Sequence, residues 1–299
     1  MQRQDVCFGT SDGITVRGWL YLPVGNAAAP AISMAHGFAA VKEHGLDRFA
    51  SLFCESGFVV LVHDHRGFGS SDGLPRDHID PWQQIADWRD AITFLEQHDR
   101  VQEDRIGIWG TSYAGGHALV LGATDPRVRC VVSQVPTISG FEQGLRRVTP
   151  DATLELERDF VEEDRRLVHG HQPDTVTVAA SDGSPAAYRT REAADFYGMP
   201  SAAGVWNNAV TVRSNRAARL YEPGIWAPRV SPTPLHFIVA THDTVTLTDL
   251  GLDAYESSRP PKGLTLVRGG HFAPYEAEFD AASAAALSWF RQHLRHSPP

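Results

Sequence analysis

The sequence predicts an α/β fold, with a mostly parallel eight-stranded sheet covered by helices on both faces. Two observations support this prediction. Short apolar runs alternate with amphipathic helical patterns through most of the 299 residues. Several runs, such as Phe-Val-Val-Leu-Val at 58–62, are apolar throughout, as expected for strands buried on both sides. A chain of this length holds one large domain with room for an insertion.

The first half of the chain supplies the opening elements in order. Apolar or β-branched composition predicts its strands, which are residues 5–10, 14–22, 31–35 and 58–62. Ser11-Asp12-Gly13 is a turn sequence that joins the first two. Apolar residues spaced by three and four predict its helices, which are residues 46–55 and 82–98.

The remaining elements continue the alternation around one long interruption. The predicted strands are residues 106–109, 128–135, 235–240 and 264–267. One predicted helix follows Ser112 and carries Ala118–Leu121. Two more are predicted at residues 246–257 and 276–294. Residues 137–231 lack buried-strand runs and are too many for a plain loop. We therefore expect residues 1–136 and 232–299 to form the core and 137–231 a mainly helical cap, whose Trp206 and Trp226 are candidate substrate contacts.

Ser112 is the candidate nucleophile. It lies in Gly-Thr-Ser-Tyr-Ala-Gly-Gly, between the apolar run at 106–109 and a helical pattern. A serine at a sharp strand-to-helix turn needs small neighbours, which Gly110 and residues 114–116 supply. The alternative is an ordinary turn in which the serine caps the helix.

A serine hydroxyl needs a base, and the base needs an orienting acid. His271 follows the last predicted strand in a Gly-Gly-His-Phe loop, which makes it the candidate base. Asp243 follows the strand at 235–240 and is the candidate acid. Asp249 and Asp253 compete for that role but fall on the following helix. All these strand ends meet at one edge of a parallel sheet.

Two backbone amides are candidates for an oxyanion hole. One belongs to Tyr113, directly after the serine, and the other to Phe38, in the loop that begins His36-Gly37. The alternative for His36-Gly37 is a simple tight turn.

Together, these motifs resemble the α/β-hydrolase superfamily. Gly-Thr-Ser-Tyr-Ala-Gly-Gly and Gly-Gly-His-Phe are similar to the branch that holds dienelactone-hydrolase-like and Xaa-Pro dipeptidyl-peptidase-like proteins, and polyketide-processing thiohydrolases or transferases. The resemblance covers residues 5–136 and 232–294. It implies a serine triad with no metal and no organic cofactor.

Composition limits the partners and the compartment. The net charge of −9 argues against nucleic acid, whose phosphates it would repel. Three scattered cysteines suit a reducing compartment, and no apolar run is long enough to span a membrane. We expect a cytoplasmic protein acting on a small molecule, with a homodimer possible.

These features predict a serine hydrolase that cleaves an ester, a thioester or another activated carbonyl bond of a small, partly apolar substrate. An acyltransferase, a cyclase or a C–C bond hydrolase would use the same triad. A ligand receptor without catalysis is the alternative from another class.

Overall fold

An eight-stranded sheet organises the chain. The computed structural model describes residues 1–294. The strands lie in the order β1-β2-β4-β3-β5-β6-β9-β10. β2 pairs antiparallel with both of its neighbours, β1 and β4, and the other strands of this sheet all run in the same direction. Their bounds are β1 (Gln2–Gly9), β2 (Thr15–Leu22), β3 (Ala29–Ala35), β4 (Val59–His63), β5 (Val101–Thr111), β6 (Val128–Gln134), β9 (Leu235–Ala240) and β10 (Lys262–Val267). The predicted fold class is confirmed.

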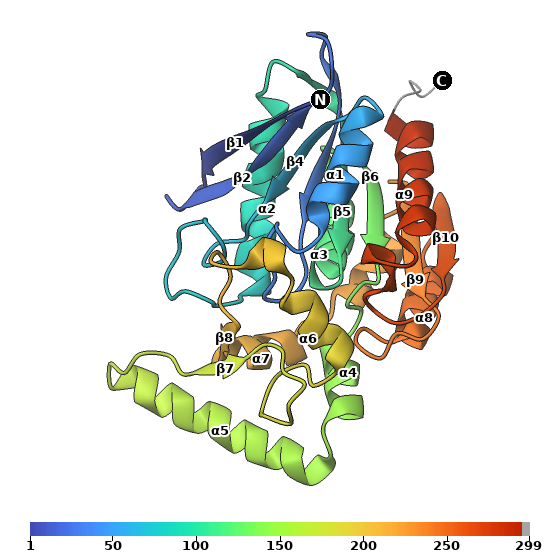
Figure 1. Cartoon of the computed structure of the whole chain (residues 1–299). Helices are drawn as coiled ribbons and strands as arrows, with labels where there is room; N and C mark the ends of the chain where they lie inside the picture. The colour runs from blue at the N-terminus through green and yellow to red at the C-terminus, as the bar shows by residue number, and fades with distance from the viewer. Residues whose placement is uncertain (295–299) are drawn as a thin grey trace.

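Helices cover both faces of this sheet (Figure 1). The helices of the core are α1 (Leu46–Glu55), α2 (Pro81–Glu96), α3 (Tyr113–Thr124), α8 (Thr248–Ser257) and α9 (Phe279–Leu294). Adjacent residues of β3 show which helix lies on which face, because successive side chains of a strand point to opposite sides. Ser33 accepts a hydrogen bond from Trp88 of α2 at 2.9 Å. Met34 pairs in register with Trp109, whose ring stacks on Phe49 of α1.

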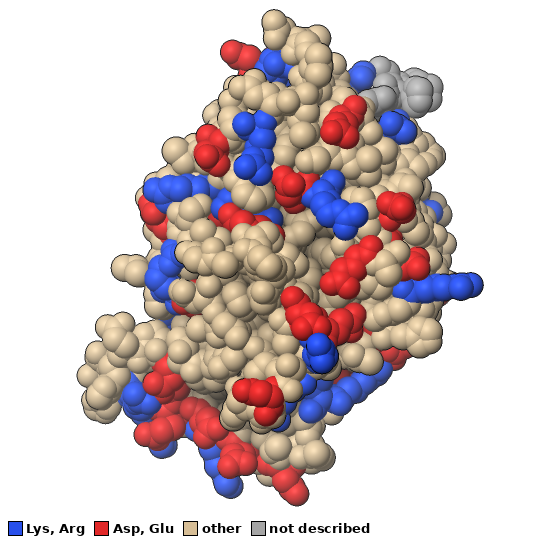
Figure 2. All heavy atoms as spheres, in the orientation of Figure 1, with Lys and Arg blue, Asp and Glu red and all other residues tan. Residues whose placement is uncertain are grey.

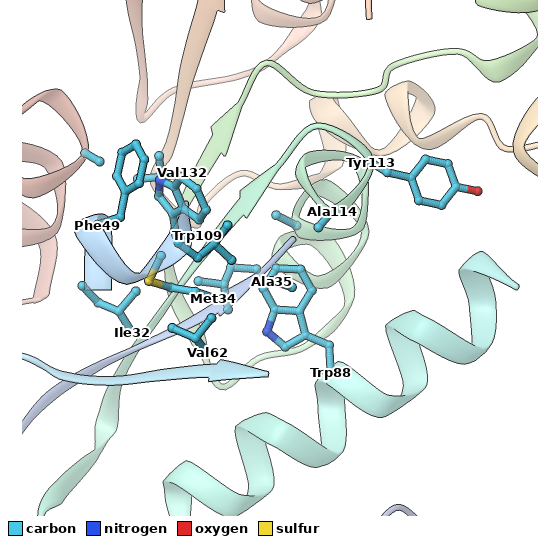
Figure 3. Packing of buried hydrophobic residues seen from close by; sticks show 14 of the residues in the cluster. Ile32, Met34, Ala35, Phe49, Val62, Trp88, Trp109, Tyr113, Ala114 and Val132 are labelled. Atoms are coloured by element: carbon cyan, nitrogen blue, oxygen red, sulfur yellow. The ribbon is translucent and has the colours of Figure 1, made fainter. Parts of the chain in front are cut away.

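Large aromatic and aliphatic side chains fill the two layers between sheet and helices (Figure 3). Trp88 and Trp109 are both fully buried, one on each side of the sheet. In the same view Tyr113 points away from the other labelled side chains, with its hydroxyl farthest from the strands. The buried cluster continues beyond Tyr113 to residues much later in the chain, such as Phe196, Tyr197 and Val210.

The chain leaves the sheet after β6 and returns at β9. The intervening elements are α4 (Gly140–Arg147), α5 (Pro150–Val168), β7 (Thr175–Thr177), α6 (Arg191–Tyr197), η1 (Pro200–Ala202), β8 (Ala209–Thr211), α7 (Val212–Arg219) and η2 (Pro223–Arg229). β7 and β8 form a small antiparallel sheet that the sequence patterns did not predict. In Figure 1, α5 lies farthest from the large sheet, and Figure 2 shows acidic and basic side chains gathered over it.

Several core elements differ from prediction at their ends. β5 begins at Val101, five residues before the predicted strand. The apolar pattern missed these residues because the first half of the strand is polar and partly exposed. The last helix begins at Phe279 instead of residue 276. Among residues 1–294, no helix is both long and apolar enough to cross a lipid bilayer.

Four buried histidines lie next to one another beneath the sheet edge. The ring of His65 contacts those of His36, His63 and His117. Burial lowers the pKa of His63 and that of His117 to about 3, and lowers the pKa of His65 well below its ordinary value. The imidazoles of His63, His65 and His117 are therefore neutral in the folded protein at neutral pH.

We expect this cluster to make the protein sensitive to acid. An unfolded histidine takes up a proton near pH ~6.5, whereas the folded state excludes it until the pH approaches the lowered value. Below pH ~6.5 each such residue should therefore remove about 1.4 kcal/mol of unfolding free energy per pH unit. Urea unfolding at a series of pH values measures the slope. His63→Met should make it shallower and the exposed His169→Gln should not; equal slopes for all three proteins would contradict the expectation.

Candidate active site

Ser112 occupies a strained turn between β5 and α3. Its backbone has φ 56° and ψ −117°, a positive φ that non-glycine residues rarely adopt. The turn is tight enough that a Cβ on Gly110 would lie 2.1 Å from the carbonyl oxygen of Ala114, and one on Gly115 would lie 2.9 Å from Cα of Pro136. Small residues are thus required on both sides of the serine, and Ala114 fits as well.

His271 and Asp243 meet Ser112 at the carboxyl edge of the sheet. The hydroxyl of Ser112 lies 2.9 Å from Nε2 of His271, and Nδ1 of His271 lies 2.8 Å from Oδ2 of Asp243. A carboxylate only accepts, so Nδ1–H donates to Asp243 and Nε2 is left to accept from the serine. This is the tautomer in which the imidazole takes the serine proton.

Asp243 is held as an anion by several donors. The amides of Val245 and Thr246 donate to its Oδ1 at 2.7 and 2.8 Å. Burial tends to raise the pKa of Asp243, but the adjacent His271 and the hydrogen bonds from Thr246 outweigh it and lower that pKa to about 2. The carboxylate is therefore charged at neutral pH and fixes the imidazole.

Thr246 is a residue that the sequence patterns did not single out. Its hydroxyl lies 2.8 Å from Oδ2 of Asp243 and 3.0 Å from the carbonyl oxygen of Val135. The signal available was local: an aspartate followed by Thr-Val-Thr after a strand is typical of a turn closed by the aspartate side chain.

The two competing carboxylates lie elsewhere. Asp249 is exposed and pairs with Arg146 at 2.6 Å. Asp253 is exposed on α8. Neither contacts His271 among the described residues, which leaves Asp243 as the acid that the geometry brings to the base.

The loop after β3 lies directly against the serine. A Cβ on Gly37 would be only 2.8 Å from Cβ of Ser112, so glycine alone permits this approach. The next residue, Phe38, touches Tyr113 with ring centroids 5.6 Å apart. His36 fixes the loop: its Nδ1–H donates to the carbonyl of Gly37, and its Nε2 accepts from the amide of His65. Phe38 and Tyr113 are thus neighbours, and each directly follows a residue of the close contact between Gly37 and Ser112.

The inserted segment holds the same loop from above. Three side chains of this segment donate hydrogen bonds to backbone carbonyls of the loop. Tyr197 donates to Phe38 at 2.7 Å, Trp206 to Ala39 at 2.7 Å, and Ser201 to Glu43 at 2.9 Å. Trp206 therefore has a partner in the loop. Trp226 lies in η2 under the guanidinium of Arg229. Neither tryptophan lines the two cavities beside the site. Their role as substrate contacts stays a prediction.

Two cavities adjoin the site. A small one touches Ser112, His271 and Gly37 directly. A larger one of about 690 Å³ lies between the core and the inserted segment and is lined at one end by Phe38, Tyr113 and Thr246. A space of this size suits a small molecule.

Comparison with known proteins agrees with this geometry. A family model described as X-Pro dipeptidyl-peptidase (S15 family) matches residues 12–153. The quorum-quenching protein AidA of Acinetobacter baumannii is 33% identical over 92% of this chain and 89% of its own. The thiohydrolase aneE of Aspergillus aculeatus is 34% identical over 86% and 82%. The chain belongs to the α/β-hydrolase family.

The similarity of this α/β hydrolase extends to three dimensions. The crystal structure of the α/β hydrolase GrgF from Penicillium superimposes with a TM-score of 0.86 at 27% identity, over 99% of this chain and 100% of that one. The relatives therefore match both the core and the inserted segment. The resemblance inferred from the serine and histidine motifs is confirmed at the level of the family.

Proposed function

We propose that this α/β hydrolase is a serine hydrolase of ester or thioester bonds that works through an acyl-enzyme. One observation carries the proposal: Ser112, His271 and Asp243 form a continuous hydrogen-bonded array at 2.9 and 2.8 Å. A charged acid, an oriented imidazole and a strained serine are the parts that nucleophilic acyl transfer requires.

The reaction follows from the donors and acceptors. His271 accepts the Ser112 proton while Oγ attacks the substrate carbonyl carbon. The amides of Phe38 and Tyr113 donate to the oxyanion of the tetrahedral intermediate. The imidazolium, stabilised by Asp243, then protonates the leaving alcohol or thiol, and the acyl group stays on Oγ. Water, deprotonated by His271, releases the acid and restores the serine.

The bond class is supported by the relatives. Two thiohydrolases, at 34% and 31% identity, and the quorum-quenching protein are among them, which favours a thioester or ester substrate. Polyketide transferases at 28–32% identity favour a second candidate, in which an alcohol or amine intercepts the acyl-enzyme in place of water. The large cavity between core and inserted segment would hold the part of the substrate that extends from the reacting carbonyl, with residues 137–231 serving as the cap.

A substrate panel tests both candidates. We expect p-nitrophenyl esters and matched acyl thioesters of graded chain length to be hydrolysed, and a fluorophosphonate probe to label the protein at Ser112. Added alcohols or amines that yield acyl products faster than water would identify the transferase. Failure of the probe to label the protein, with no turnover of any ester or thioester, would instead favour a ligand receptor.

A further inference from the structure

We propose that the large cavity binds substrates that carry an anionic group in addition to the reacting carbonyl, and that Arg147 and Arg219 hold that group. This inference rests on the proposed acyl-transfer function and names the substrate class for the same site. The reacting carbonyl would lie at Ser112, and the anion against the arginines that line the cavity.

The cavity begins at the site and passes between the core and the inserted segment. Phe38, Tyr113 and Thr246 line its near end. Apolar side chains follow, including Val148, Leu156 and Val176. A substrate whose carbonyl reaches Ser112 would therefore have both apolar side chains and arginines beside the part of it that occupies the cavity.

The charges on the walls are of one sign. Among the described residues, 1–294, those lining the cavity include Arg147, Arg189 and Arg219 but no aspartate or glutamate. This contrasts with the whole chain, whose net charge is −9. Arg147 and Arg189 are exposed and Arg219 is partly buried, so this positively charged wall is in contact with solvent and attracts anions toward the cavity.

Arg219 is the most enclosed of these three arginines, since Arg147 and Arg189 are exposed. Its side chain is 14% exposed, and its Nε is buried without a hydrogen-bond acceptor in the described structure. The carboxylate nearest to it, Glu157, is 3.7 Å away and half exposed, so the pairing is loose. Gly144 makes room for this guanidinium, because a Cβ there would lie 2.7 Å from Nη1. A ligand oxygen would satisfy a donor that the protein leaves unpaired.

Arg147 is anchored but not neutralised. One Nη donates to the carbonyl of Val245, and its Cζ lies 5.4 Å from the centre of the Tyr188 ring. Within residues 1–294 no carboxylate lies within ion-pair distance of Arg147. A guanidinium has five N–H donors, so the anchored side chain keeps several for a ligand. Val245 and Tyr188 fix its direction, which reduces the entropy lost on binding.

The planar donors of arginine fit either a carboxylate or a phosphate. Two sources of the anion are therefore compatible with the cavity: a carboxylate on the acyl chain, or a phosphate on the leaving group, as in a phosphopantetheine thioester. Both are small-molecule acyl donors with the same charge requirement.

Matched substrate pairs test the proposal. The first pair is p-nitrophenyl hydrogen suberate and p-nitrophenyl methyl suberate, which differ in the charge at the end of the acyl chain. The second is the octanoyl thioesters of phosphopantetheine and of pantetheine. We expect the anionic member of one pair to show a KM lower by about tenfold, since a charge-assisted hydrogen bond contributes that much, with kcat little changed. The pair that shows it identifies the source of the anion.

Arginine variants and added salt then test whether the preference for the anionic substrate depends on Arg147 and Arg219. Arg147→Gln and Arg219→Gln should each reduce the preference and together abolish it, whereas Arg219→Lys, which keeps the charge, should retain part of it. Arg146→Gln is the matched control, because Arg146 is the neighbouring residue, pairs with Asp249 and lies outside the cavity. Added salt should weaken the preference in the wild type.

Two outcomes are kept distinct. Equal KM values within both pairs, in a protein that hydrolyses them, would overturn the anion site and leave the proposed function intact. If nothing is hydrolysed, the proposed function fails, and calorimetric titration of Ser112→Ala with suberate and with dimethyl suberate still decides the site. Tighter binding of the dianion, lost in Arg147→Gln/Arg219→Gln, supports it; equal binding refutes it.

Discussion

Ser112→Ala should lower kcat by about 10⁴- to 10⁶-fold, the range that removal of the nucleophile produces in serine hydrolases. The hydroxyl is the group that attacks the carbonyl, and His271 contacts it at 2.9 Å. Alanine keeps Cβ and leaves its strained backbone in place, held by the hydrogen bond from the Ser112 amide to the carbonyl of Gln134 at 2.8 Å. The thermal unfolding temperature should therefore change little.

Turnover of an ester and covalent labelling by a fluorophosphonate measure this effect together. Ser139→Ala is a matched control, because Ser139 is also a buried serine but caps α4 by accepting from the amide of Glu142. That variant should lose some stability and keep its labelling. If Ser112→Ala retained wild-type turnover and labelling, another residue would be the nucleophile.

Asp243→Asn should lower kcat by about 10⁴-fold while leaving the fold intact. The amide oxygen of asparagine can still accept from the amides of Val245 and Thr246, so the turn survives. Its NH₂ group would face Nδ1 of His271 and favour the tautomer that carries the proton on Nε2. That imidazole cannot accept the Ser112 proton, and the negative charge that stabilises the imidazolium is gone as well.

Asp249→Asn is the control for this change. Asp249 lies on α8, just beyond the same loop, but pairs with Arg146 at the surface. Its replacement should leave kcat unchanged. A loss of activity in Asp249→Asn equal to that in Asp243→Asn would mean that the acid has been assigned to the wrong residue.

The buried strands and the nucleophile turn could be predicted because their signals are local. The apolar run at 58–62 is β4 almost residue for residue, and the small residues around Ser112 are those that its close contacts demand. The start of β5 could not be predicted in this way. Residues 102–105 are polar and have no partners in β3, because the register shifts there from Val101 opposite Ala29 to Ile106 opposite Ala31. They belong to the strand because the residues on both sides of them pair with β3, and not because of their own preference.

Trp206 makes a contact that the sequence could not indicate. Its place in an aromatic-rich insertion suggested contact with substrate, yet its indole N–H donates to the carbonyl of Ala39. An indole N–H that is partly buried needs an acceptor. Which acceptor it finds depends on how residues 191–206 dock on a loop more than 150 positions earlier in the chain. The two arginines of the large cavity were likewise indistinguishable in sequence from solvated helix residues such as Arg146.

The sequence by itself determined the alternation of strands and helices, the order of serine, acid and base along the chain, and the family to which the protein belongs. These depend on side-chain pattern and on residues within a few positions of one another. Only the tertiary structure decided that Thr246, beside the acid, contacts Val135, that Tyr197 and Trp206 hold the loop beside Ser112, and that Arg147 and Arg219 face one cavity. These contacts join segments far apart in the chain, so they exist only once the sheet edge and the inserted segment have packed together.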